Sequence, residues 1–472
     1  MLEKPVFWNG SLFLQALAKQ KSRSLQINLI FSTLAIALAG PAQGFEVKGQ
    51  FRAGGYSSQV KLLDDISGLG NNDASVISNR LNMNFYQFNQ SQDEINLDFR
   101  DRYNFFGKAD REILELKDEN TFEARELAYR RPWQKHRLYF TAGRYIPKEA
   151  GLITNDGADV GYRLTRDHRI GAFAGIADQS LITPPSIQPD TRGYNGTQGG
   201  AYWVYDRSDS RRMDATYMTN AIAQAPTAEL IEFVNKVQFY HLSLFQLGPQ
   251  HRLSNHFNLD LAPDPKLRQA YISYHYYSPR YRLTSYYNRI SPEENRILKE
   301  IQDDLVPSTV DMLSANLIQR LSSVLSLEYR LQLGRRAADG KQRQVLAVGS
   351  RYLGFLRGRM ALGGLFGLRN NYQSSDQYID LKLDFYQSKW SVHLEQGLAN
   401  KAYEAGGPKL FETRTAGELA FYFGERLRGS AAFSQTKNEQ VEVTTMFLMI
   451  GYYFGTGTTS PIRSISPIFE GI

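Results

Sequence analysis

The chain has 472 residues, no cysteine, 28 Tyr and 27 Phe. Its mean hydropathy is −0.42 and 22% of its residues are charged. These values exclude a polytopic helical membrane protein, which needs repeated apolar runs of about 20 residues. The absence of cysteine excludes a disulfide framework, a thiolate zinc site and a cysteine nucleophile. The aromatic fraction of 12% is unusual for a soluble enzyme, and tyrosine favours surroundings that are partly apolar and partly wet.

The first 44 residues have the features of a secretory signal peptide. A basic cluster within residues 19–23 precedes an uncharged run over residues 24–44. That run holds an apolar segment, a break at Gly40-Pro41 and then small residues of the kind that a signal peptidase reads. We therefore predict that residues 1–44 are removed on export. A signal anchor that stays attached is the alternative.

The net charge gives little support to nucleic-acid binding. The whole chain carries +7, but Lys4, Lys19, Lys21 and Arg23 lie in the predicted leader, where only Glu3 opposes them. Much of the positive excess is therefore absent from the mature chain. A nucleic-acid binder needs a dense basic face, so we expect no nucleic-acid partner.

From residue 45 onward, apolar residues recur at every second position. Over 325–333, leucine and tyrosine alternate with Ser326, Glu328, Arg330 and Gln332. Successive side chains of a strand point to opposite faces, so each such strand has one apolar and one charged face. The segments match the roughly 9–11 residues that cross a bilayer better than the usual soluble strand of about 5–6 residues. Charges would be costly in a sandwich core, whereas the wet interior of a barrel accommodates them.

The alternation predicts an all-β protein, a closed antiparallel transmembrane barrel of about 22 strands, within a range of roughly 16 to 22. The segments 122–132 and 211–221 show the pattern least clearly. The connections between predicted strands alternate between long and short. The long ones include residues 61–77, 108–121, 147–157, 179–198, 222–235, 292–309 and 401–409.

The tight connections, such as Ser91-Gln92 and Ser388-Lys389, are those that follow even-numbered strands. Outer-membrane barrels have short periplasmic turns and longer external loops. Both ends of the mature chain are therefore predicted to be periplasmic. Aromatic residues near the short turns predict a periplasmic aromatic girdle; they are Trp133, Tyr139, Tyr281, Phe355 and Trp390.

Over residues 45–454 the chain resembles a Gram-negative outer-membrane β-barrel of the porin type. Its last strand, 441–454, ends on Phe454 and is similar to the aromatic-ending strand that the barrel assembly machinery reads. The tail 455–472 departs from the family, whose members usually stop at that strand. The resemblance implies outer-membrane lipid and lipopolysaccharide around the barrel, and the barrel assembly machinery as a partner. A TonB-dependent transporter has as many strands, but the alternation begins at Phe45 and leaves no room for a plug.

We predict a pore lined by charges of both signs. The candidates on the predicted inner faces are Lys48, Arg52, Asp98, Arg100, Arg102, Glu328, Arg330, Asp380, Lys382 and Asp384. Opposed rows of acids and bases would create a transverse field that orients polar solutes. The alternative is that neighbouring strands pair these charges into inert ladders. The loops 108–121, 179–198 and 292–309 could narrow the pore or be solvated external loops.

No motif predicts catalysis. The seven histidines form no HExxH or comparable ligand spacing, so we expect no metal, no cofactor and no catalytic residue. The expected function is passive or weakly selective diffusion of small hydrophilic solutes through the outer membrane. One alternative is a non-conducting barrel whose external loops serve adhesion or surface structure. The other is a hydrolase at the barrel rim, for which Ser254 and His256 are the conceivable pair.

Overall fold

The structure is a computed structural model. It describes residues 46–63, 72–88, 93–106, 119–133, 135–147, 154–178, 195–206, 216–229, 232–262, 265–291, 309–372, 374–403, 407, 409–424 and 426–455. The predicted leader, the tail after Gly455 and most of the loops 108–121, 179–198 and 292–309 lie outside these residues. The signal peptide, the tail and the roles of those loops therefore stay predictions.

Alternating side chains produce strands along the whole described chain. They are β1 (Glu46–Leu62), β2 (Asn72–Phe88), β3 (Asp93–Phe106), β4 (Glu119–Arg131), β5 (Leu138–Tyr145), β6 (Asn155–Arg163), β7 (His168–Asp178), β8 (Asn195–Asp206), β9 (Thr216–Glu229), β10 (Glu232–Gln246), β11 (His251–Ala262), β12 (Lys266–Tyr277), β13 (Tyr281–Ile290), β14 (Val310–Arg320), β15 (Leu325–Arg336), β16 (Gln342–Phe355), β17 (Met360–Asn371), β18 (Ser374–Tyr386), β19 (Trp390–Tyr403), β20 (Lys409–Phe423), β21 (Leu427–Lys437) and β22 (Val441–Gly455). A short 3-10 turn, η3 (Leu356–Gly358), joins β16 to β17.

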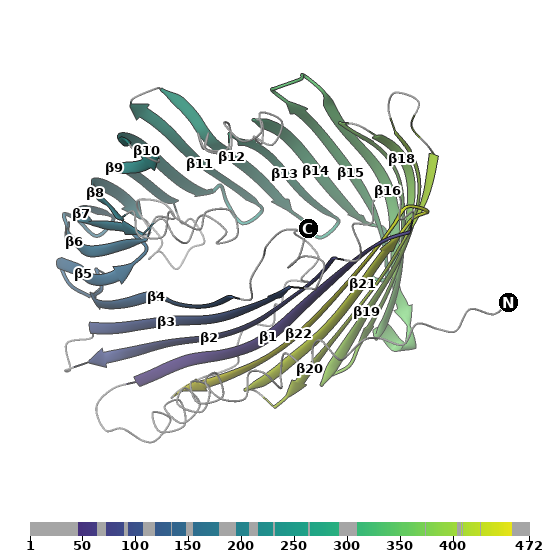
Figure 1. Cartoon of the computed structure of the whole chain (residues 1–472), viewed down its shortest axis with the longest axis horizontal. Helices are drawn as coiled ribbons and strands as arrows, with labels where there is room; N and C mark the ends of the chain where they lie inside the picture. Colours follow the sequence, from purple (N-terminus) through teal and green to yellow (C-terminus); the bar gives the residue numbers. More distant parts are fainter. Residues whose placement is uncertain are drawn as a thin grey trace.

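The strands close into one antiparallel barrel. Each pairs with its neighbours in chain order within a 22-stranded sheet. The ring is completed where β1 pairs with β22, with Arg52 opposite Gly451; in Figure 1 the purple β1 lies beside the yellow-green β22. The predicted fold class is confirmed. Because the barrel is closed, both edges of every strand pair with a neighbouring strand. No sheet edge is left whose backbone groups would be exposed to lipid without a partner.

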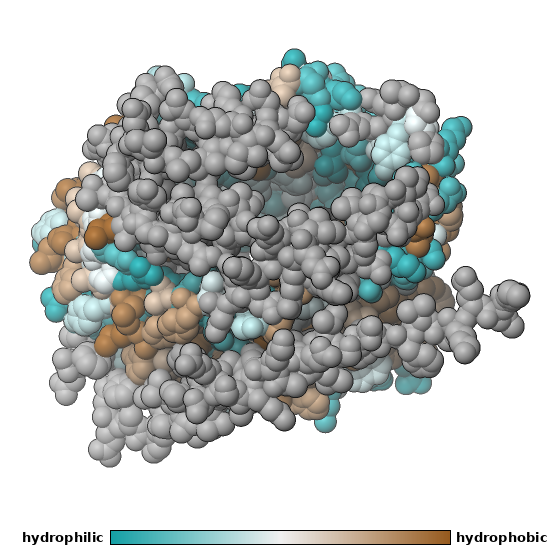
Figure 2. All heavy atoms as spheres, viewed as in Figure 1, coloured by the Kyte–Doolittle hydropathy of each residue, from teal (hydrophilic) through white to brown (hydrophobic). Residues whose placement is uncertain are grey.

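The two faces of the barrel wall differ as the alternation requires. Leu346 and Phe366 are 56% and 52% exposed, whereas Ala347 and Leu365, on the opposite face of the same strands, are 1% and 5% exposed. Figure 2 shows hydrophobic side chains gathered on the outer wall and hydrophilic ones within the opening. Among the described residues, no helix is long and apolar enough to cross a membrane, a finding that says nothing about β-barrels.

The closing seam carries a buried apolar cluster. Val47, Leu81, Met83 and Phe454 are each at most 4% exposed and pack together. The ring of Phe454 lies over Gly49, where an added Cβ would stand 2.4 Å from a ring carbon. Glycine at position 49 is therefore what allows the last strand to dock its aromatic end on the first.

The connection between β16 and β17 has an unusual backbone. Leu356 and Arg357 have φ angles of 48° and 58°, in the left-handed region that residues other than glycine rarely adopt. Arg357 has a ψ of 41°, and Leu356 is 60% exposed. This turn thus presents an apolar and a basic side chain at the barrel rim despite backbone strain.

We expect the double substitution Leu356→Asn and Arg357→Gly to stabilise the folded barrel. Asparagine and glycine tolerate positive φ, and the left-handed conformation costs roughly 1–2 kcal/mol for each ordinary residue. A gain of about 1–2 kcal/mol is therefore expected. It should appear as a higher temperature for the shift from the folded to the unfolded band on detergent gels. A lower transition temperature would contradict the strain argument.

The prediction of a long loop at 222–235 is wrong. Residues 216–229 form β9 and residues 232–246 form β10, and the two strands pair over their length. The alternation is weak in this segment because alanine recurs through 221–228 and Pro226 interrupts it, so neither face is strongly apolar. Pairing with β10 satisfies the backbone there. Several other connections on the same side are also short, for example residues 372–373 and 438–440.

Candidate functional site

The predicted pore-lining residues all lie on the inner face of the barrel wall, which is turned away from exposed apolar side chains such as Tyr329, Leu381 and Ile450. They form two groups. Lys48, Arg52, Asp98, Arg100 and Arg102 lie on β1 and β3. Glu328, Arg330, Asp380, Lys382 and Asp384 lie on β15 and β18.

Most charges of the second group are paired along the same wall. Arg330 Nε donates to Glu328 Oε1 at 2.6 Å. Asp384 accepts from Arg351 Nη2 at 2.8 Å and lies 2.5 Å from His393 Nδ1. Inner-facing acids and bases meet because adjacent strands are about 4.8 Å apart. For this group the structure therefore has paired ladders rather than opposed rows.

The pairing of charges continues onto β19 through His393 and Glu395, which are not among the predicted pore-lining residues. Lys382 Nζ lies 3.3 Å from Glu395 Oε2, and His393 Nε2 lies 3.7 Å from the same carboxylate oxygen. His393 thus stands between Asp384 and Glu395. Asp380 has no ion pair among the described residues, although Lys382 stands two positions along the same strand. The inner wall formed by β15–β19 thus carries charges of both signs, and most of them are neutralised by a neighbour of opposite sign.

Arg52 and Arg100 of the first group belong to a row of arginines that crosses the seam. Arg428 of β21 lies opposite Gly451 of β22, which lies opposite Arg52 of β1. Arg52 lies opposite Arg80 of β2, and Arg80 lies opposite Arg100 of β3. We call Arg428, Arg52, Arg80 and Arg100 the arginine row. The strands are tilted relative to the barrel axis. A row that runs perpendicular to the strands therefore also rises along the pore wall.

The arginine row is only partly neutralised. Arg80 makes a bidentate pair with Asp98, at 2.8 Å from Nε and 2.6 Å from Nη2. Within the part of the chain that the structure describes, Arg52, Arg100 and the nearby Arg102 make no ion pair. Like charges at directly opposite positions destabilise a sheet. Because these arginines are retained on the inner face, this part of the wall presents positive charge to the lumen.

The facing wall is polar and mostly uncharged in its middle. In a ring of strands in chain order, β11–β14 lie across from β22–β3. Ser254 and Ser273 hydrogen-bond through their hydroxyls at 2.5 Å, and Tyr271 stacks on Tyr286 with ring centroids 6.1 Å apart. The other inner-facing residues in this region include His256, Asn258, Thr284, Asn288, Ser314 and Asn316.

The conceivable catalytic pair is not assembled. Ser254 Oγ bonds to Ser273, and the ring of His256 packs on Tyr240 with centroids 4.8 Å apart. The structure shows no hydrogen bond between Ser254 and His256. Among the described residues, no group of three or more His, Asp or Glu side chains is placed to hold a metal ion.

A buried aromatic cluster lies on the inner face of β5–β8. It consists of Tyr139, Phe173, Tyr202 and Val204, with Trp133 and Tyr240 packed against it. Tyr202 donates to Asp159 Oδ1 at 2.7 Å. Tyr139 is 7% exposed, so the prediction that Trp133 and Tyr139 join the outward girdle is wrong.

Glycines explain the inward placement of these rings. An added Cβ at Gly161 would lie 2.1 Å from the Tyr139 ring, and one at Gly171 would lie 2.3 Å from the Tyr202 hydroxyl. The rings therefore lie flat across glycines of the neighbouring strand. By contrast, Tyr281, Phe355 and Trp390 of the predicted girdle are 40–41% exposed.

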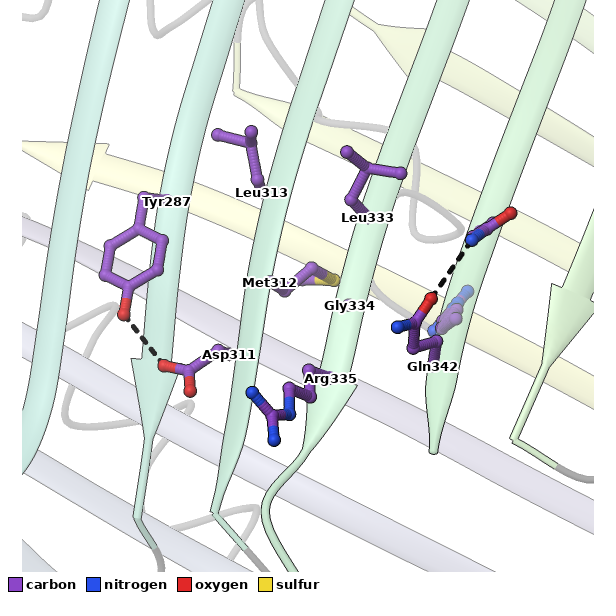
Figure 3. Close-up of a pocket in the computed structure, with 10 residues that line it drawn as sticks. Tyr287, Asp311, Met312, Leu313, Leu333, Gly334, Arg335 and Gln342 are labelled. Atoms are coloured by element: carbon purple, nitrogen blue, oxygen red, sulfur yellow. Dashed lines mark hydrogen bonds between the residues drawn. The ribbon is translucent and has the colours of Figure 1, made fainter. Parts of the chain in front are cut away.

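A hollow near the loop ends of β13–β16 opens on the outside of the barrel. Figure 3 shows Tyr287 donating to Asp311, with Leu313, Leu333 and Arg335 beside them; the Tyr287 bond is 2.7 Å long. Leu313 and Leu333 are 43% and 42% exposed on the apolar face. This hollow is therefore not part of the lumen wall.

The adjoining turn between β15 and β16 carries an ion pair with a defined pH dependence. Arg336 donates two hydrogen bonds to the Asp339 carboxylate, and they lower the pKa of Asp339 to about 2. Because the folded pKa is depressed, the pair's contribution to stability is present above the ordinary pKa and is lost as the pH falls through about 2.

We expect carboxyl NMR of labelled protein to show Asp339 titrating near its depressed pKa. In the Arg336→Gln variant the midpoint should rise toward the ordinary aspartate value of about 3.9. A wild-type midpoint already near that ordinary value would contradict the ion pair.

Known proteins offer only distant likenesses. No protein-family model matches the chain, and no curated protein matches it. Among solved structures, OccK7 (OpdD) of Pseudomonas aeruginosa is 9% identical, covers 87% of this chain and 100% of that chain, and has a TM-score of 0.43. A BenF-like porin from Pseudomonas fluorescens Pf-5 is 10% identical, with coverage of 87% and 98% and a TM-score of 0.42. OccAB3 of Acinetobacter baumannii is 9% identical, with coverage of 87% and 99% and a TM-score of 0.41.

The pairing of the chain's own strands establishes its architecture. The sheet closes between β1 and β22, leucine and phenylalanine side chains are exposed on the outer face, and charged and hydroxyl side chains occupy the inner face. A wall of this kind is stable with lipid outside and water inside. The chain folds as a closed antiparallel β-barrel of 22 strands with an apolar outer face and a polar inner face.

Proposed function

We propose that the protein is a passive outer-membrane channel for small hydrophilic solutes and that it favours anions. The arginine row and the nearby Arg102 carry the proposal, because Arg52, Arg100 and Arg102 present positive charge from the inner face without an ion pair among the described residues. A row of like charge along a pore raises the local concentration of the opposite charge. The neutral wall of β11–β14 does not cancel that field.

The closed ring supports conduction in a second way. A barrel of about 16–18 strands or more is wide enough to leave an aqueous lumen unless loops or a plug fill it. The β15–β19 wall, with its paired charges, offers a hydrated surface of no net sign. We further propose that both mature termini face the periplasm, and that the outer face contacts lipopolysaccharide after insertion by the barrel assembly machinery.

The test is electrical. Purified, folded protein in planar bilayers should give discrete conductance steps, and a salt gradient should give a reversal potential on the anion-selective side. Complete absence of steps, also after deletion of residues 456–472, would reject the channel in favour of a non-conducting surface barrel. Lipid or peptide hydrolysis lost in Ser254→Ala would favour a rim hydrolase.

A further inference from the structure

The rim that carries the strand ends Glu46 and Gly455 also carries the short connections, and four of the five between β12 and β21 contain a base. We call the connections 278–280, 321–324, 356–359, 387–389 and 424–426 the short-turn rim. Its exposed bases are Arg280, Arg357, Arg359, Lys389 and Arg426, and Arg282 and Arg320 flank it. Glu425 is the one acid that the sequence places in these connections.

These bases differ from many of those at the opposite rim. There, several bases pair with carboxylates: Arg289 Nη1 lies 3.3 Å from Asp311 Oδ1, and Arg369 Nη2 lies 2.7 Å from Asp376 Oδ2. Lys401–Glu412, Lys437–Glu442 and Arg336–Asp339 are further pairs of that rim. At the short-turn rim, none of the named bases makes an ion pair with another described residue. Among the described residues, their charge therefore has no carboxylate partner.

Exposed apolar side chains stand next to these bases in the sequence. Tyr281 follows Arg280, Trp390 follows Lys389, and Phe355-Leu356 precedes Arg357. Tyr281, Phe355 and Trp390 are 40–41% exposed, Leu356 is 60% and Phe423 is 63% exposed. The same alternation of base and ring is thus repeated around this side of the barrel. Outward aromatic rings settle at the headgroup level of a bilayer, which places the neighbouring bases at the depth of the lipid phosphates.

The strained turn between β16 and β17 supports a role for this surface. Leu356 and Arg357 keep left-handed backbone conformations, with φ of 48° and 58°. Asn-Gly would suit such a turn far better. The sequence instead holds a large apolar residue and a base there, both exposed.

We propose that the short-turn rim binds the phosphates of anionic phospholipid headgroups and so anchors the barrel in the phospholipid leaflet. This goes beyond solute passage and rests on the proposed periplasmic orientation of the termini. Guanidinium groups bind phosphate with paired hydrogen bonds, and clustered bases beside a membrane are drawn to anionic lipid. The rings supply the apolar contact that fixes the depth.

Native mass spectrometry of the folded full chain tests the proposal. The protein is released from nanodiscs of equal phosphatidylglycerol and phosphatidylethanolamine, and the retained lipids are counted. The triple variant Arg357→Gln, Arg359→Gln and Lys389→Gln should retain about fivefold less phosphatidylglycerol relative to phosphatidylethanolamine, since even one base near an anionic surface contributes roughly 1 kcal/mol. The charge-matched control Lys61→Gln, Arg335→Gln and Lys409→Gln, at the other rim, should behave as wild type.

Three outcomes would overturn the proposal: equal retention in both triple variants, a larger loss in the control, or capture by purified peptidoglycan sacculi without preference for phosphatidylglycerol. Detergent-gel band shifts confirm that every variant is folded. Conductance recorded on the same samples separates the two proposals, because lipid retention does not require an open pore and an open pore does not require lipid retention.

Discussion

Replacing Arg52, Arg100 and Arg102 with glutamine is expected to remove most of the channel's preference for anions. These three arginines face the lumen and make no ion pair with a described carboxylate, although Glu123 lies opposite Arg100 on the next strand. Glutamine keeps much of the side-chain volume and its hydrogen-bonding capacity, so the pore should still conduct. The anion-to-cation permeability ratio should fall several-fold toward unity, because the field that concentrates anions is lost.

The measurement is the reversal potential across a tenfold salt gradient in planar bilayers. It should be made near 0.1 M salt, where the Debye length is about 10 Å, because at 1 M it shrinks to about 3 Å and hides the wall charge. The triple variant Lys61→Gln, Arg335→Gln and Lys409→Gln removes equal charge away from the row and should keep the wild-type potential. An unchanged potential in the lumen variant would show that the row does not face the conduction path.

Asp98→Asn should act in the opposite direction. Asp98 binds Arg80 through both carboxylate oxygens, so its loss frees a further arginine toward the lumen. The anion preference should rise. The triple variant also changes two residues of β3, so opposite shifts in the two variants could not come from a general distortion of that strand.

The strands themselves could be predicted from the sequence because lipid on one side and water on the other impose a period of two. The segment 325–333 shows this: its leucines and tyrosine lie outward, and Glu328 and Arg330 lie inward. The signal weakened at β9, where alanine fills the apolar positions and backbone pairing with β10 decides the structure. Alternation also predicts which face each charged residue occupies, because neighbouring positions point to opposite sides of the wall.

The grouping of those residues could not be predicted in the same way. Arg52, Arg80, Arg100 and Arg428 are far apart in the sequence and become one row only through the registers of successive strand pairs. A shift of one residue in any of those registers would place the side chains on opposite faces. The same holds for Tyr139, whose inward ring depends on Gly161 of the next strand. A glycine opposite an aromatic residue would indicate such an inward ring. That pairing can be recognised only once the register of the two strands is known.

Gly49→Val is expected to prevent stable closure of the barrel. Its Cβ would lie 2.4 Å and 2.6 Å from two ring carbons of Phe454 and 2.8 Å from the backbone oxygen of Asn82. The ring can turn aside only by leaving the buried cluster with Val47 and Met83, and the backbone oxygen belongs to the paired strand β2. Overpacking a core typically costs about 1–3 kcal/mol, and here it acts on the seam that closes the ring.

Refolding from urea into detergent or lipid vesicles measures this effect without the cellular assembly machinery, so Phe454 is tested as a packing residue alone. Gly49→Val should give a much smaller fraction of the folded band, and that band should unfold at a lower temperature. Gly364→Val is the matched control, because an added Cβ there meets only Leu381, at 3.7 Å. Combining Gly49→Val with Phe454→Ala should recover part of the folded fraction, since the ring collision is removed while the contact with Asn82 remains. Normal folding of Gly49→Val would mean that the docking of β22 on β1 tolerates a different position of the Phe454 ring, and that close contact at residue 49 does not control closure.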